Sequence, residues 1–163
     1  MQTIMDNLTV LLNKALNLHK DGKLCGTDDL YKSLVGSIGE SEIVSLTEGI
    51  SVNGKFDVLG KVRFPGRIEV KTANKSTQGM LGAWSLMCKR NGCDYFALVD
   101  ASNLTHDSYR ISMVPHDAMF EFLDTPNSKG NTPDFIRWSE SYNETDNKSP
   151  EATALFVKYE IDY

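Results

Sequence analysis

One stretch of this chain, residues 56–72, constrains the fold more than any other. Its apolar positions predict two β-strands, and the Pro-Gly dipeptide at 65–66 is typical of a tight turn between antiparallel strands. In an extended strand, side chains alternate between the two faces, so Glu69 and Lys71 point to the same side. The hairpin therefore brings Asp57, near the start of the first strand, towards Glu69 and Lys71.

Two carboxylates and a lysine on a strand pair suit one kind of chemistry. Carboxylate oxygens hold Mg²⁺, which keeps much of its water shell and also accepts phosphate oxygens as ligands; Mn²⁺ can take its place. Such a metal acidifies a bound water and neutralises charge that builds up on a phosphate. Lys71 would orient that water or stabilise the developing negative charge. Asp57, Glu69 and Lys71 thus predict a metal-dependent site that hydrolyses phosphodiester bonds.

The order of Asp57, a turn, and Glu69-Val70-Lys71 resembles the signature of the PD-(D/E)XK nuclease superfamily, with Phe56 where the family has proline. The resemblance covers roughly residues 39–114. It implies an α/β (α+β) fold of the restriction-endonuclease-like kind, with a mixed central sheet flanked by helices. It also implies a Mg²⁺-dependent DNA endonuclease in which Asp57 and Glu69 are metal ligands and Lys71 is catalytic.

A short amphipathic helix is predicted over 35–46, because apolar residues recur along one side of it. Its other side carries Glu40 and Glu42. Members of the resembled family often supply a further metal ligand from such a helix, which makes Glu40 the fourth site residue and Glu42 its alternative. Solvated helix acids would give the same pattern. The resemblance also places Gln78, near the start of the next helix, beside the metal.

The following elements are predicted in the order helix then strand. Residues 77–90 have apolar side chains at helical spacing, and residues 94–100 form an apolar run short enough for a buried central strand. That strand would lie parallel to a strand of the hairpin. The other predicted elements are an N-terminal helix (3–20), a strand (109–114), a short helix (116–123), a loop-rich tail (124–151) and a final strand (154–163).

The chain has 163 residues, 40% of them hydrophobic, which predicts a single globular domain. We divide it into a helical N-terminal part (1–48), a catalytic core (49–123) and a loop-rich C-terminal part with a final strand (124–163). Its three cysteines follow no spacing typical of a zinc site or a disulfide framework. No apolar run reaches the about 20 residues that cross a bilayer, and no secretory leader is recognisable, so we expect a cytoplasmic protein without a membrane partner.

The net charge of −5 is unevenly distributed. Residues 55–90 contain eight basic and two acidic side chains, whereas residues 117–163 contain four basic and ten acidic ones. A local positive field attracts polyanions even when the whole molecule is acidic. We therefore expect DNA as the partner. The predicted contacts to phosphates or base edges are Lys61, Arg63, Arg67 and Lys75. A solvated charged face is the alternative explanation of the same residues.

A single domain with one site would cut both strands of a duplex most simply as a two-fold homodimer. The helix predicted over 3–20 would pack within the fold or form that dimer contact. Sequence-specific cleavage, of the restriction or homing type, is the main functional hypothesis. Two alternatives stay open. One is a structure-specific repair nuclease of the Holliday-junction-resolvase type, and the other is a non-catalytic module that binds nucleic acid or protein through a salt-bridged face.

Overall fold

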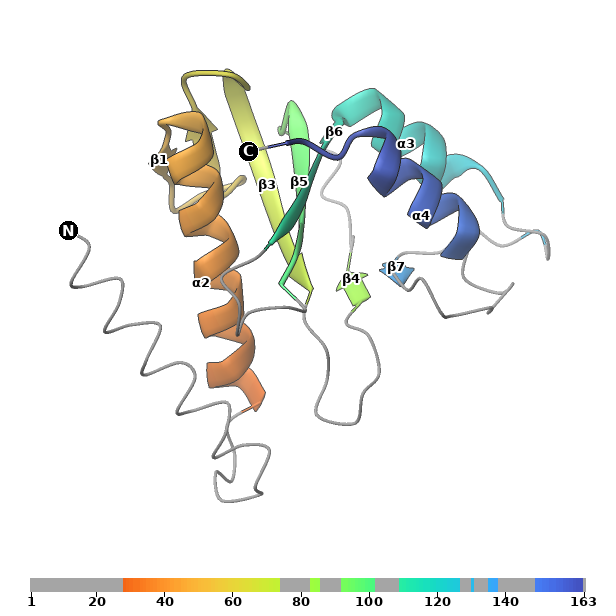
Figure 1. Cartoon of the computed structure of the whole chain (residues 1–163), viewed down its shortest axis with the longest axis horizontal. Helices are drawn as coiled ribbons and strands as arrows, with labels where there is room; N and C mark the ends of the chain where they lie inside the picture. The colour runs from red at the N-terminus through yellow and green to blue at the C-terminus, as the bar shows by residue number, and fades with distance from the viewer. Residues whose placement is uncertain are drawn as a thin grey trace.

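The computed structural model of the chain describes residues 28–73, 83–85, 92–101, 109–126, 130, 135–137 and 149–162. They form a five-stranded sheet between helices and a separate two-stranded ribbon (Figure 1). The helix predicted over 3–20 lies outside the described residues, as do Lys75 and Gln78.

The main sheet has the strand order β1-β2-β3-β5-β6. Its strands are β1 (Ile50–Ser51), β2 (Val58–Gly60), β3 (Gly66–Ala73), β5 (Tyr95–Asp100) and β6 (Arg110–Pro115). β3 and β5 pair in parallel, and the other neighbouring strands pair antiparallel. The predicted α/β fold with a mixed sheet is therefore confirmed. So are the antiparallel pairing of β2 with β3, the buried strand that follows it, and the parallel pairing of β3 with β5. The tight turn predicted at Pro65-Gly66 is wrong, because Gly60 pairs with Gly66 and residues 61–65 form a longer connection.

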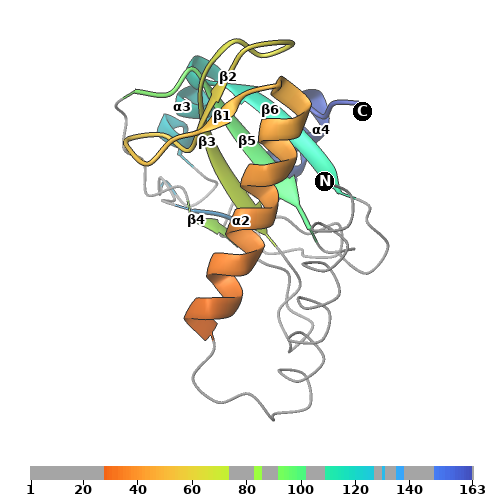
Figure 2. The ribbon, with the colours of Figure 1, turned by 90° about the vertical axis from the view of Figure 1, so that its left-hand side faces the viewer.

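Helices cover both faces of this sheet (Figures 1 and 2). α2 (Asp28–Thr47) packs on one face, and α3 (His116–Asp124) and α4 (Ser149–Lys158) pack on the other. β5 is buried on both sides, since its alternate residues belong to two different cores. None of the helices in the described part of the chain is long and apolar enough to span a membrane.

α2 confirms the helix predicted over 35–46 and extends it in both directions. Its end is fixed by Thr47, whose hydroxyl donates to the carbonyl of Ile43 at 2.7 Å. The carbonyl of Thr47 in turn accepts hydrogen bonds from the backbone N–H groups of Lys61 and Val62, at 3.1 and 2.9 Å. The C-terminal end of α2 is thereby tied to the residues that follow β2.

The helix predicted over 77–90 is wrong at its centre, where β4 (Ala83–Ser85) is a strand. β4 pairs antiparallel with β7 (Phe135–Arg137), a strand within the tail that was predicted to be mostly loop. Helical spacing of apolar residues is a local signal, and a strand partner from far along the chain overrides it here. The strand and short helix predicted at 109–114 and 116–123 are confirmed as β6 and α3.

The final strand predicted over 154–163 is also wrong, because α4 continues to Lys158. Ala152 and Phe156 lie four residues apart and are 1% and 0% exposed, so this segment has a helical period as well as the alternation that predicted a strand. Val157, which the alternation placed with one set of apolar residues, is 54% exposed.

The residues after α4 cover the outer edge of β6. The backbone N–H of Met113 donates to the carbonyl of Tyr159, and the N–H of Ile161 donates to the carbonyl of Ile111, both at 3.0 Å. The strand-like part of the C-terminal segment is therefore short and begins only where the helix ends. Covering an edge in this way satisfies backbone groups that would otherwise be open to another chain.

Because α4 is a helix, substitutions at two neighbouring residues should change the free energy of unfolding by very different amounts. Phe156→Ala should lower the free energy of unfolding by about 3–5 kcal/mol, because it removes a fully buried aromatic side chain. Val157→Ala should change it by less than about 0.5 kcal/mol, because that side chain faces solvent. Urea denaturation of the two variants measures both values. A larger loss at Val157 than at Phe156 would contradict the helix.

Candidate active site

The carboxylate of Asp57 lies where the pairing of β2 with β3 stops. β2 pairs with β3 only from Gly66 to Ile68. Just beyond this point, the backbone N–H of Asp57 donates to the carbonyl of Ile68 at 3.0 Å. Its carboxylate Oδ2 accepts a hydrogen bond from the backbone N–H of Val70 at 2.7 Å. A side chain thus takes the place of the next strand residue and fixes the carboxylate beside the peptide that joins Glu69 to Val70.

Glu69 and Lys71 share one face of β3, as the alternation of a strand requires. This face lies away from α2, because Ile68 and Val70 are buried in the core that α2 covers. The Nζ of Lys71 donates to the Oε1 of Glu69 at 2.5 Å. The side chains of Lys71 and Glu69 are 30% and 20% exposed. They are therefore neither spread apart nor sealed under apolar packing.

α2 brings a third carboxylate to this region through a close contact with β3. Gly39 is buried against Thr72, and a Cβ at position 39 would overlap the hydroxyl of Thr72 and lie 3.1 Å from its Cβ. Only a residue without a side chain lets the helix approach the strand so closely. Glu40, the residue after Gly39, is half-buried. Glu42 lies further along α2 and is also half-buried.

The pKa of Glu40 is raised by its burial and is affected by three nearby charges. Burial is the largest cause that raises the pKa of the Glu40 carboxyl above its usual value. The negative charge of Asp57 raises it further, the positive charge of Lys71 lowers it, and the negative charge of Glu69 raises it. Charges act strongly over short distances in a partly dry site. Glu40, Asp57, Glu69 and Lys71 therefore share one electrostatic environment, contributed by α2, the start of β2, and β3.

The carboxylates suit a hard cation by their chemistry, although they do not form a finished cage. Within the described part of the chain, no group of three or more His, Cys, Asp or Glu side chains is positioned to hold a metal ion. Mg²⁺ does not need such a group, because it is commonly bound through one or two carboxylates and completes its shell with water and phosphate oxygens. Asp57, held at the Val70 N–H, and Glu69, one residue before Val70 on β3, are the carboxylates available for this smaller requirement.

Arg67, a predicted DNA contact, is engaged by Asp94. Its Nε and Nη2 donate to the two carboxylate oxygens of Asp94, each at 3.0 Å, and its backbone N–H donates to Oδ2 at 2.8 Å. The side-chain hydrogen bonds from Arg67 are the main reason why the pKa of Asp94 is lowered to about 2. Sequence reasoning missed this pair. The only sequence signal at Asp94 was its place as the first residue of the strand predicted over 94–100, and β5 begins one residue later.

The other predicted DNA contacts differ in their surroundings. Arg63 has a left-handed backbone with φ of 63°, and its Nη2 donates to the backbone carbonyl of Asp162 at 2.6 Å. Lys61 is exposed. Arg63 therefore helps to hold the C-terminal segment. Of the three predicted contacts that the structure describes, two have partners within the protein.

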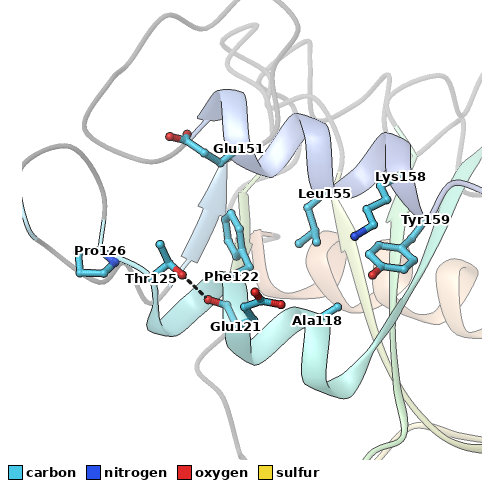
Figure 3. Close-up of a pocket in the computed structure, with 9 residues that line it drawn as sticks. All are labelled: Ala118, Glu121, Phe122, Thr125, Pro126, Glu151, Leu155, Lys158 and Tyr159. Atoms are coloured by element: carbon cyan, nitrogen blue, oxygen red, sulfur yellow. Dashed lines mark hydrogen bonds between the residues drawn. The ribbon is translucent and has the colours of Figure 1, made fainter.

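Two hollows lie away from these acids. A groove with a cavity volume of about 300 Å³ runs between α3 and α4 (Figure 3). The residues that line it are Ala118, Glu121, Phe122, Thr125, Pro126, Glu151, Leu155, Lys158 and Tyr159. A second hollow, of about 650 Å³, lies beside Arg67, Asp94 and His116. Neither hollow is lined by any of the four acidic and basic residues of the candidate site.

Comparisons with known proteins do not show a family. No family model matches the chain, and no curated protein matches it. Among solved structures, the chain is similar to the crystal structure of MepB, with a TM-score of 0.42 and 10% sequence identity. The alignment covers 85% of this chain and 97% of that one.

The contact of α2 with β3 predicts a difference between two glycines of the same helix. Gly39→Ala should lower the free energy of unfolding by about 1–3 kcal/mol, because the added methyl group overlaps Thr72. Gly36→Ala is the matched control. Nothing lies within 4 Å of a Cβ there, so alanine should stabilise the helix by up to about 1 kcal/mol. Equal effects of the two substitutions on urea denaturation would contradict the close contact.

The raised pKa of Glu40 predicts how stability depends on pH. Because the folded-state pKa lies above 4.5, ionised Glu40 destabilises the fold, and this cost appears as the pH rises through 4.5 and the folded-state pKa. Glu40→Gln should therefore raise the free energy of unfolding at pH 7, and the gain should vanish below about pH 4. Glu121→Gln, at an exposed position on α3, is the control and should show no such gain. A loss of stability in Glu40→Gln at pH 7 would contradict the shift.

Proposed function

We propose that this protein is a metal-dependent endodeoxyribonuclease that hydrolyses DNA phosphodiester bonds. The observation that carries the proposal is the hydrogen bond from the Val70 N–H to the Asp57 carboxylate. It holds one acid beside the tripeptide that contains the second acid and the lysine. A surface stabilised only by salt bridges has no need to bring a further carboxylate next to one that is already paired.

Each residue has a role in this proposal. Asp57 and Glu69 would hold Mg²⁺ or Mn²⁺, and Glu40 would complete the site directly or through a water. The bound cation supplies an acidified water and neutralises charge on the phosphate. Lys71 would orient the attacking water or donate to the phosphate oxygen on which charge develops. Glu40, with its raised pKa, is also suited to exchange a proton with that water.

The order of elements supports a restriction-endonuclease-like fold within the α/β class. The helix α2, which carries Glu40, precedes the β2–β3 hairpin, and β5 then runs parallel to β3. The resemblance to the PD-(D/E)XK superfamily implies this order with a crossover helix between β3 and β5, and the strand β4 lies where that helix was expected. Site-specific cleavage of the restriction or homing type by a cytoplasmic homodimer is the form we propose first. A structure-specific nuclease of the repair or junction-resolving type would use the same chemistry.

One observation favours a second candidate, a non-catalytic module that binds nucleic acid or protein. Lys71 is paired with Glu69, which is also what an exposed salt-bridged face would look like. The need of the Val70 N–H for an acceptor accounts for Asp57 in this alternative too, but it gives no reason for the half-buried carboxylate of Glu40. Cleavage therefore explains more of the arrangement than binding alone.

The nuclease proposal predicts nicking or linearisation of supercoiled plasmid in the presence of Mg²⁺ or Mn²⁺. Asp57→Ala and Lys71→Ala should each lower the cleavage rate by about 100-fold or more, because the first removes a metal ligand and the second removes a positive charge that acts on the reacting phosphate. Asp117→Ala and Lys158→Ala remove the same charges from exposed positions on α3 and α4 and should cleave like the wild type. Cleavage without added metal, or equal cleavage by all four variants, would contradict the proposal.

A further inference from the structure

We propose that the ammonium of Lys71 is a resident counter-ion of Glu69 that an incoming divalent cation displaces. Metal binding and the release of Lys71 towards the substrate would then be one coupled event. This inference rests on the proposed function and describes how the same site is regulated. In the metal-free protein Lys71 is withheld from the phosphate, and only the metal frees it.

The first support is geometric. Lys71 and Glu69 are two residues apart on one strand face, and Nζ lies 2.5 Å from Oε1. The lone pair of Oε1 that accepts this ammonium is not open to a metal while the pair is formed. Both side chains are partly buried, at 30% and 20% exposed, so water replaces this contact less readily than on an open surface.

The second support is the balance of charge. Glu40, Asp57 and Glu69 are the three acids of the candidate site, and Lys71 pairs with one of them, Glu69. Like-charged carboxylates repel one another, and a single cation among them reduces that repulsion. Lys71 therefore does for the metal-free site what a divalent cation does more strongly, since the metal carries twice the charge and can be shared by two carboxylates.

The third support is what must happen to Lys71 when a metal binds. A divalent cation on Glu69 repels an ammonium at the same oxygen. Lys71 lies on β3, whose backbone is held on one side by β5, so the strand is fixed and the side chain is what moves. The side chain of Lys71 is 30% exposed, so it has access to solvent. Its ammonium would then face an incoming phosphate.

The test is calorimetric titration of the metal-free protein with Mg²⁺ or Mn²⁺ in the absence of DNA. Lys71→Met should bind the cation about tenfold more tightly than the wild type, because the competing ammonium is gone. Lys55→Met removes an exposed ammonium two residues before Asp57 and controls for the general loss of positive charge. It should change the affinity by less than about twofold. Asp57→Ala should abolish binding, which identifies the site that is titrated.

A second measurement does not depend on how Lys71→Met folds. NMR of the lysine ammonium groups in the wild type should show the Lys71 signal shifting as Mg²⁺ is added, with the affinity found by calorimetry. The ammonium of Lys158, which lies 5.1 Å from the ring centre of Tyr159, should not shift and is the internal control.

The outcomes separate this inference from the proposed function. If the wild type binds the cation and cleaves DNA, but Lys71→Met binds no more tightly or the Lys71 signal stays fixed, the counter-ion role is overturned and the nuclease stands. An equal gain of affinity in Lys55→Met would also overturn it, because charge alone would then explain the effect. If no variant binds a divalent cation at the site of Asp57, both proposals fall.

Discussion

The hydrogen bond between the Val70 N–H and the Asp57 carboxylate is the contact on which the candidate site depends. A backbone N–H of a half-buried strand needs an acceptor, and leaving it unpaired costs about as much as a lost hydrogen bond. β2 ends before it can supply a carbonyl at this point, so a carboxylate does so. The need to satisfy β3 thus places an acid directly beside Glu69 and Lys71.

This arrangement has an energetic cost that the rest of the fold must offset. Burial is the largest cause that raises the pKa of the Glu40 carboxyl, and the negative charges of Asp57 and Glu69 raise it further. The positive charge of Lys71, which pairs with Glu69, lowers it. Gly39 maintains the arrangement from the other side of β3, because it lets α2 lie against Thr72. Clustered acids held together at a cost are more typical of functional sites than of surfaces selected for stability.

Two of the basic residues near the site are engaged within the protein. Their clustering in the sequence suggested a free positive surface, but Arg67 is paired with Asp94, and Arg63 holds the carbonyl of Asp162. Arginines that order a turn or a chain terminus are less available for phosphates. A count of charges along the chain therefore overstates the positive field near the acids. In the proposed nuclease, the metal and Lys71 would contribute more to substrate binding than these arginines.

The sequence by itself determined the hairpin, β5 and its parallel pairing, β6, α3, and the helix that carries Glu40. In each of these, the pattern of apolar residues has one consistent meaning. The approach of Asp57 to the Glu69–Val70 peptide follows from the antiparallel pairing of β2 with β3, which sets the register of the two strands. Tertiary structure decided the rest. β4 is a strand because β7 lies beside it, and α4 is a helix because burying Phe156 and Ala152 on one side wins over an alternation that fits equally well. The approach of Glu40 and the partners of Arg63 and Arg67 also depend on residues far along the chain. Local periods describe what a segment can bury, and only packing chooses the neighbour against which it is buried.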